Sequence, residues 1–223
     1  MSPSDPRRVF TRAILRWSAG NARSFPWRET REPFAVLVAE LLLQKTASYK
    51  VIRIYEPFLR RYPSPGALAN ADPDEVRALL APLGLPRRAQ RLIELGRLLE
   101  DSHGGKVPRQ HARLLALPGV GPYTANAVQC FAFGGRRPLV DEVVARVYRR
   151  FFGLPTAKRA YEDVGLWNFV EGLLPRHRAR DFSLAVLDFA SGVCTFKRPK
   201  CESCLLRGRC LSRLSSSESL RND

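Results

Sequence analysis

The stretch from Leu117 to Asp141, LPGVGPYTANAVQCFAFGGRRPLVD, constrains the fold of this chain more than any other. Gly119 and Gly121 flank a single valine, so the backbone there can turn sharply and approach another group closely. Pro122 suits the first position of a helix, because its missing N–H needs no partner there. The pattern predicts a tight turn, a helix that stops at glycines, and an aspartate directly before the next helix.

Local spacing leaves two interpretations of this turn open. It is either an ordinary connection between two helices of an all-α core, or a turn whose N–H groups meet a phosphate at a helix N-terminus. The rest of the chain must decide between them.

Helical periodicity recurs along the whole chain, and no segment shows a strand pattern. The fold class is therefore all-α, with ten or so helices. A stiff aromatic linker, Phe25 to Arg28, follows the first of them. Outside the opening stretch, the pattern predicts helices over residues 6–19, 33–43, 48–61, 87–103, 110–116, 142–152, 160–173 and 180–193, and a further helix that starts at Asp72.

The net charge of +16 and the pI of about 10.5 favour a polyanionic partner. The alternatives are a basic surface kept for solubility and, less well supported, an acidic membrane surface. No apolar run is long enough to span a bilayer, and the N-terminus carries no signal-peptide pattern. We expect a soluble protein of the cytoplasm, associated with the nucleoid.

Four cysteines lie close together near the C-terminus, in the pattern C-x6-C-x2-C-x5-C. In a reducing compartment such a group indicates a metal site rather than disulfides. The spacing favours an iron–sulfur cluster over zinc, with free thiols as the remaining alternative. The predicted metal ligands are Cys194, Cys201, Cys204 and Cys210.

The loop between the first two of these cysteines is basic. Lys197, Arg198 and Lys200 would form a phosphate clamp fastened to a rigid cluster, or they are merely solvated surface charges. The fifth cysteine, Cys130, lies on the apolar face of a predicted helix and is expected in the core.

One charge, Glu40, interrupts the apolar run from Phe34 to Leu43. A carboxylate inside such a run is costly unless it is paired, hydrogen-bonded or facing a cleft. The alternative is that helical rotation brings Glu40 to the solvent edge, and the pattern alone favours neither.

Taken together, LPGVGPYTAN, then LVDEVVARV, then the four cysteines resemble the helix–hairpin–helix DNA glycosylases of the endonuclease III superfamily. The resemblance runs from about Phe25 to Cys210. With FPWRETREPFAVLVAELLLQKT, the sequence is most similar to archaeal thymine–guanine mismatch glycosylases of the Mig type.

The resemblance implies two helical lobes with DNA in the cleft between them. One lobe would be a six-helix domain over residues 24–136. The other would combine residues 1–23 with 137–211 and carry a [4Fe–4S] cluster, followed by a mobile tail over 212–223. It also implies a monovalent cation on backbone carbonyls of the hairpin.

Family position implies a role for each candidate catalytic residue. Asp141 would stabilise an oxocarbenium-like sugar or activate water, although it could instead serve only as a helix cap. Glu40 would face the flipped base, and Tyr123 would lie against the sugar or base. Because tyrosine cannot form a Schiff base, lyase activity should be weak or absent.

Family position also implies the DNA contacts. The turn Gln44-Lys45, with Leu85 in a second turn, would fill the space that a flipped base leaves. For Leu85 the alternative is a core leucine beside a turn. Gly119, Val120 and Gly121 would offer N–H groups to a phosphate.

The expected function is a monofunctional glycosylase that removes thymine or uracil opposite guanine from double-stranded DNA, acting as a monomer. One alternative is a MutY-type adenine glycosylase acting on A·G or A·8-oxoG. Such enzymes typically continue into a further domain, whereas this chain ends 13 residues after Cys210. The other alternative is a DNA-binding protein without catalysis, against which the presence of both Asp141 and Glu40 argues.

Overall fold

Proline residues and side-chain caps mark many of the helix starts in this sequence. Among the residues that the structure describes, six α-helices carry proline in their first turn. In the same part of the chain, six begin at a residue whose side chain accepts a backbone N–H of the first turn. Both devices satisfy or remove donors that a helix N-terminus leaves unpaired. The capping residues are Asp5, Glu32, Ser64, Asp72, Asp141 and Asp163.

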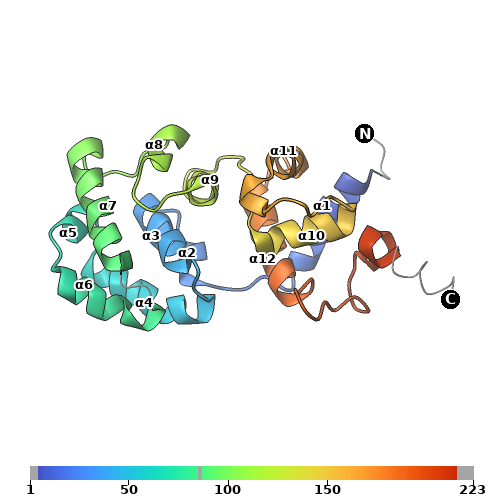
Figure 1. Cartoon of the computed structure of the whole chain (residues 1–223), viewed down its shortest axis with the longest axis horizontal. Coiled ribbons are helices and arrows are strands. Elements are labelled where there is room, and N and C mark those ends of the chain that lie inside the picture. The colour runs from blue at the N-terminus through green and yellow to red at the C-terminus, as the bar shows by residue number, and fades with distance from the viewer. Residues whose placement is uncertain (1–4, 85–86, 215–223) are drawn as a thin grey trace. The chain divides into compact units, whose positions relative to one another are not determined.

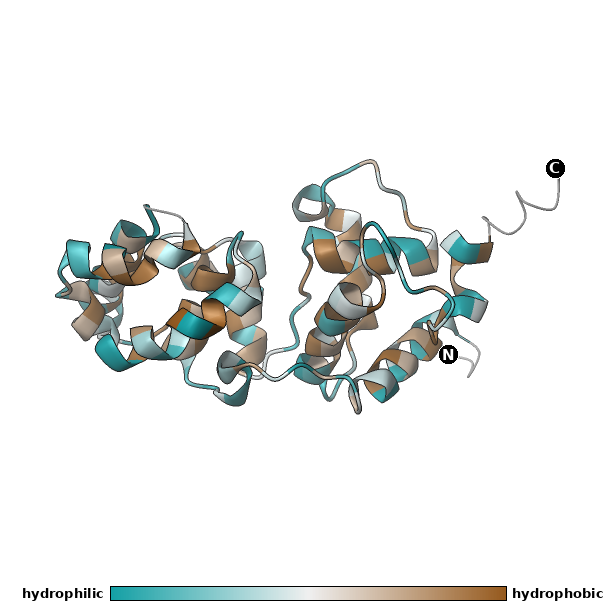
Figure 2. Cartoon of the chain, turned by 90° about the horizontal axis from the view of Figure 1, so that it is seen from below, coloured by the Kyte–Doolittle hydropathy of each residue, from teal (hydrophilic) through white to brown (hydrophobic). Residues whose placement is uncertain are grey.

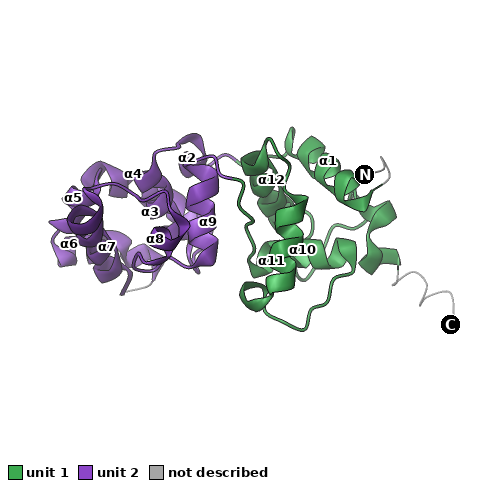
Figure 3. Cartoon of the chain, turned by 90° about the horizontal axis from the view of Figure 1, so that it is seen from above, with its two compact units in different colours: residues 1–23, 136–223 green, residues 24–135 purple. Residues whose placement is uncertain are grey.

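The computed structural model describes residues 5–84 and 87–214, and these residues contain helices and no strand, which confirms the all-α prediction. They divide into two compact units (Figure 3). Unit 2 is continuous, from Ser24 to Gly135, whereas unit 1 joins the chain up to Arg23 with the chain from Arg136 onward.

In its described residues, unit 2 holds eight α-helices, labelled in Figure 1, and one 3₁₀ turn. They are α2 (Pro26–Glu29), α3 (Pro33–Leu43), α4 (Ser48–Arg61), α5 (Pro65–Ala69), α6 (Pro73–Leu80), the 3₁₀ turn η1 (Ala81–Leu83), α7 (Arg87–His103), α8 (His111–Leu115) and α9 (Pro122–Phe131). Its central helix α3 is buried on all sides from Phe34 to Leu42 and packs against α4 and α9.

Unit 1 contains the first helix and the C-terminal ones. They are α1 (Pro6–Ser18), α10 (Glu142–Phe152), the 3₁₀ turn η2 (Ala160–Glu162), α11 (Val164–Leu173), α12 (Ala179–Gly192) and the 3₁₀ turn η3 (Arg207–Arg209). Phe10 of α1 is fully buried, and its ring lies 5.0 Å from that of Phe151 and 5.7 Å from that of Tyr148. In both units the apolar sides of the helices face inward (Figure 2).

The structure departs from the predicted elements in a few places. Two short helices were not predicted: α2, which Pro26 starts within the aromatic linker, and α5, which follows the Ser64 cap. Helices of four and five residues are too short to show periodicity. The helix predicted over 160–173 is split, because the Asp163 side chain accepts the N–H of Leu166 and begins a new helix there.

The structure also bears on the predicted domain boundary, on the predicted tail and on membrane spans. Arg136, placed at the end of the first lobe, donates hydrogen bonds to the carbonyls of Glu171 and Leu174 in unit 1. Of the tail predicted to be mobile, residues 212–214 continue a helical turn and the remainder lies outside the described residues. No described helix is long and apolar enough to cross a membrane.

The contact between α5 and α7 depends on a glycine. A Cβ atom on Gly96 would lie 2.7 Å from the backbone nitrogen of Ala69 and 2.9 Å from the carbonyl oxygen of Pro65. Neither backbone atom can move aside cheaply, so α5 would have to shift.

We expect Gly96→Ala to lower the free energy of unfolding by about 2 kcal/mol, as overpacking does elsewhere. The free energy of unfolding is measured by urea denaturation, with circular dichroism as the signal. The control is Gly192→Ala, whose Cβ would meet nothing within 4 Å. Equal stability of the two variants would contradict the close α5–α7 contact.

Candidate functional site

The glycine turn of the opening stretch connects α8 to α9 in unit 2. Gly119 has φ +79°, a left-handed conformation, and a Cβ there would lie 2.5 Å from Cδ of Arg91. The N–H of Val120 donates to the carbonyl of Leu117, whereas the N–H groups of Gly119 and Gly121 make no hydrogen bond to the described residues. Two backbone donors at the start of α9 are thus available to a ligand.

The end of α3 is tied to this turn by a glutamine. Nε2 of Gln44 donates to the carbonyl oxygen of Gly119 at 2.9 Å and to Oγ1 of Thr124 at 3.3 Å. Two sets of predicted DNA contacts, Gln44-Lys45 and the hairpin, are therefore brought together in unit 2. The side chain of Lys45 is exposed. The third predicted contact, Leu85, lies outside the described residues.

Glu40 and Tyr123 lie on two helices that pack against each other, α3 and α9. Glu40 is only 7% exposed, so the interpretation that helical rotation carries it to the solvent edge is wrong. Tyr123 is in the first turn of α9 and is half-buried. Cys130 is fully buried further along the same helix, in the core where it was expected.

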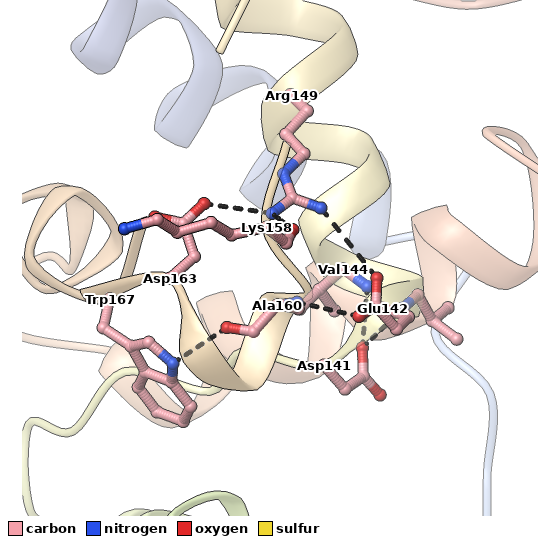
Figure 4. Close-up of polar contacts among 9 residues, drawn as sticks. Asp141, Glu142, Val144, Arg149, Lys158, Ala160, Asp163 and Trp167 are labelled. Atoms are coloured by element: carbon pink, nitrogen blue, oxygen red, sulfur yellow. Dashed lines mark hydrogen bonds and ion pairs between the residues drawn. The ribbon is translucent and has the colours of Figure 1, made fainter. Parts of the chain in front are cut away.

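Asp141 is the N-cap of α10 in unit 1 (Figure 4). Its Oδ1 accepts the N–H groups of Val143 and Val144, both at 2.8 Å. The second oxygen, Oδ2, makes no hydrogen bond to the described residues and points away from the helix in Figure 4. Burial raises the pKa of this carboxyl above its ordinary value, against the lowering effect of the two N–H groups and of Arg146.

The first turn of α10 is braced by the segment that follows the helix. Oε1 of Glu142 accepts the N–H of Ala160 at 2.7 Å, and Ala160 in turn accepts the indole N–H of Trp167 (Figure 4). Buried Arg149 pairs with Asp163 at 3.0 Å and donates to the carbonyl of Lys158. The sequence analysis did not identify Arg149, because nothing in the sequence distinguishes a buried arginine from the many exposed ones.

The four cysteines line one pocket of about 470 Å³ together with Arg150. Burial raises the pKa of the Cys204 and Cys210 thiols, and the other cysteines add to this effect. Among the described residues, no three cysteine, histidine or acidic side chains converge closely enough to hold a single metal ion.

Two arginines of α10 hold the cysteine loop. Arg146 donates to the carbonyl of Cys194 at 2.9 Å, and Arg150 donates to those of Thr195 and Phe196 at 2.8 and 3.0 Å. Their four-residue spacing places them on one face of the helix, a signal in the sequence that the prediction did not use. Lys197, Arg198 and Lys200 are exposed on the loop thus held.

Comparison with known proteins places these residues in a family. The family model of the HhH-GPD superfamily base excision DNA repair protein matches residues 38–168, which include Glu40, the hairpin and Asp141. A thymine/uracil-DNA glycosylase of Pyrobaculum aerophilum is 44% identical over 202 residues, covering 88% of each chain. An adenine DNA glycosylase of Mycobacterium tuberculosis is 38% identical over 92% of this chain and 68% of its own length.

The fold agrees with this similarity. The structure of a thermostable thymine-DNA glycosylase superposes with a TM-score of 0.90 at 36% identity, covering 94% of this chain and 97% of the other. The sequence resemblance is thereby confirmed, and the chain belongs to the HhH-GPD superfamily of base excision DNA repair proteins.

Proposed function

We propose that this protein is a monofunctional DNA glycosylase that hydrolyses the N-glycosidic bond of thymine or uracil opposite guanine after base flipping. The observation that carries the proposal is the Asp141 carboxylate, with one oxygen fixed on α10 and the other directed away from it. Support for the substrate comes from the thymine/uracil-DNA glycosylase, which is 44% identical over 88% of each chain.

The chemistry needs a carboxylate near the sugar. Breaking the glycosidic bond creates positive charge at C1′, which an ionised Asp141 would stabilise while orienting the attacking water. The two N–H bonds to Oδ1 fix the rotamer, so Oδ2 is the oxygen that would face the sugar. Glu40, buried in α3, would protonate the leaving base or orient water. Tyr123, on the neighbouring α9, would contact the base or sugar.

DNA binding would involve both units. The two N–H groups of the hairpin suit a phosphate, and Lys197, Arg198 and Lys200 would bind a second stretch of backbone. Gln44 and Lys45 would occupy the space left by the flipped base, together with Leu85. A monovalent cation would bind hairpin carbonyls such as that of Gly119, which has a second lone pair beside its bond to Gln44.

Cys194, Cys201, Cys204 and Cys210 would hold a [4Fe–4S] cluster. In such a cluster each iron takes one cysteine, so the four cysteines that line one pocket would supply its full set of ligands. When bound, the cluster would cross-link the ends of the basic loop, whose backbone Arg146 and Arg150 already hold.

Base release tests the function directly. Duplexes carrying T·G, U·G, A·G or A·8-oxoG are incubated with the protein and scored for strand cleavage after hot alkali. We expect cleavage of T·G and U·G alone. Asp141→Asn should lower the rate by about 10²-fold or more while keeping DNA binding and the melting temperature, because asparagine also caps helices.

The matched control is Glu142→Gln, which keeps an acceptor for the N–H of Ala160 and should retain the rate. Release of adenine alone would favour the adenine glycosylase instead. DNA binding without release of any base would favour a protein that only binds DNA.

Tyr123 predicts the absence of lyase chemistry. With borohydride present, the wild-type protein should form no covalent adduct with the T·G duplex, because it places no amine at this position. Tyr123→Lys should form a trapped adduct, and Tyr123→Phe should form none. A trapped adduct on the wild-type protein would contradict the monofunctional mechanism.

The cofactor can be tested without activity. Protein purified without oxygen should be brown, absorb broadly at the blue end of the visible spectrum, and contain about four iron atoms per chain. Cys204→Ser should lose the colour and the iron, whereas Cys130→Ala, at the buried cysteine of α9, should keep both. Stoichiometric zinc in a colourless protein would refute the cluster.

A further inference from the structure

The turn after α3 has a lysine where glycine is the usual residue. The N–H of Thr46 donates to the carbonyl of Leu43 at 3.1 Å, which closes a four-residue turn. Gln44 has φ −56° and ψ 119°, and Lys45 has φ +53°. These angles are those of a type II turn, whose third position favours glycine because the backbone there is left-handed. Lys45 is thus held in a conformation that it would rarely adopt by itself.

A buried arginine of α7 holds both sides of this lysine. Arg88 is only 6% exposed, and its Nη2 donates to the carbonyl of Gln44 at 2.7 Å and to Oγ1 of Thr46 at 2.9 Å. Its Nη1 donates to the carbonyl of Leu42 at 2.9 Å. One planar guanidinium therefore binds residues directly before and directly after Lys45, as only arginine can.

The charge of Arg88 is met by backbone dipoles rather than by an acid. Among the described residues, no carboxylate pairs with it, and two of its acceptors are carbonyls at the C-terminus of α3, the negative end of the helix. A buried cation costs free energy, which argues that its three hydrogen bonds matter for the turn. The Gln44 side chain fixes the same turn from the hairpin side.

We propose that Arg88 is a positioning residue that holds Lys45 in the left-handed conformation, so that the turn is rigid before DNA arrives. The proposal rests on the proposed function in one respect, namely that Gln44 and Lys45 enter the duplex. Because the turn is already ordered, the conformational entropy of residues 44 and 45 does not have to be lost when the base is flipped.

The test asks whether Arg88 acts through the backbone of residue 45. Arg88→Met keeps the length of the side chain and removes the donors, and it is made in proteins carrying Lys45, Lys45→Ala or Lys45→Gly. Alanine and glycine both remove the lysine side chain, but only glycine adopts the left-handed conformation without cost. Arg87→Met, at the exposed neighbouring arginine, controls for the lost charge.

The first measurement is amide hydrogen exchange of residues 43–47, which needs no activity. Arg88→Met should speed exchange in this segment. The increase should be about tenfold larger with alanine at position 45 than with glycine, because only alanine carries the free-energy cost of the left-handed conformation. The second measurement is the single-turnover rate of base release from the T·G duplex, which should fall in the same pattern. Arg87→Met should change neither.

Equal effects of Arg88→Met with alanine and with glycine at position 45 would overturn the proposal, because Arg88 would then not act through that residue. If exchange follows the expected pattern but the wild-type protein releases no base, the proposed function fails and the role of Arg88 in the turn stands. Should Arg88→Met not fold, Arg88→Lys replaces it, since one ammonium cannot make all three bonds.

Discussion

Unit 1 depends on the arginines of α10. Arg146 and Arg150 hold the cysteine loop by its backbone carbonyls, while Arg149 holds the 158–163 segment from a buried position. The same helix begins at Asp141, so the catalytic candidate and both loops share one rigid element. A helix only 11 residues long thereby sets the positions of parts of the chain that are far apart in sequence.

Unit 2 shows a related solution with different residues. Gln44 connects the end of α3 to the hairpin, and Arg88 connects it to α7, so three elements meet at one turn. Besides the ion pair that Arg149 makes with Asp163, long polar side chains in both units, namely those of Arg146, Arg150, Gln44 and Arg88, bind main-chain carbonyls. Such bonds fix backbone geometry directly, and they do not depend on a second side chain being ordered.

The sequence was sufficient for the parts of the fold that follow local rules. Proline or aspartate located several helix starts, including those of α6, α9 and α10, and the glycine turn lies before α9 and Asp141 before α10 as the sequence predicted. The roles of Arg88 and Arg149 could not be predicted, because burial of an arginine depends on elements that meet only in three dimensions. The left-handed Lys45 was missed for a different reason, since no glycine marks the turn.

The order of the two units along the chain bears on how the protein is made. Unit 2 is continuous, so all of its elements are available for folding once Gly135 has been synthesised. Helix α1 precedes unit 2 in the chain but packs against α12, and Phe10 also contacts Tyr148 and Phe151 of α10, so the apolar face of α1 gains these partners only after unit 2 has been synthesised. On the ribosome, α1 therefore waits for its partners throughout the synthesis of unit 2, and unit 1 closes only after α12 has been synthesised.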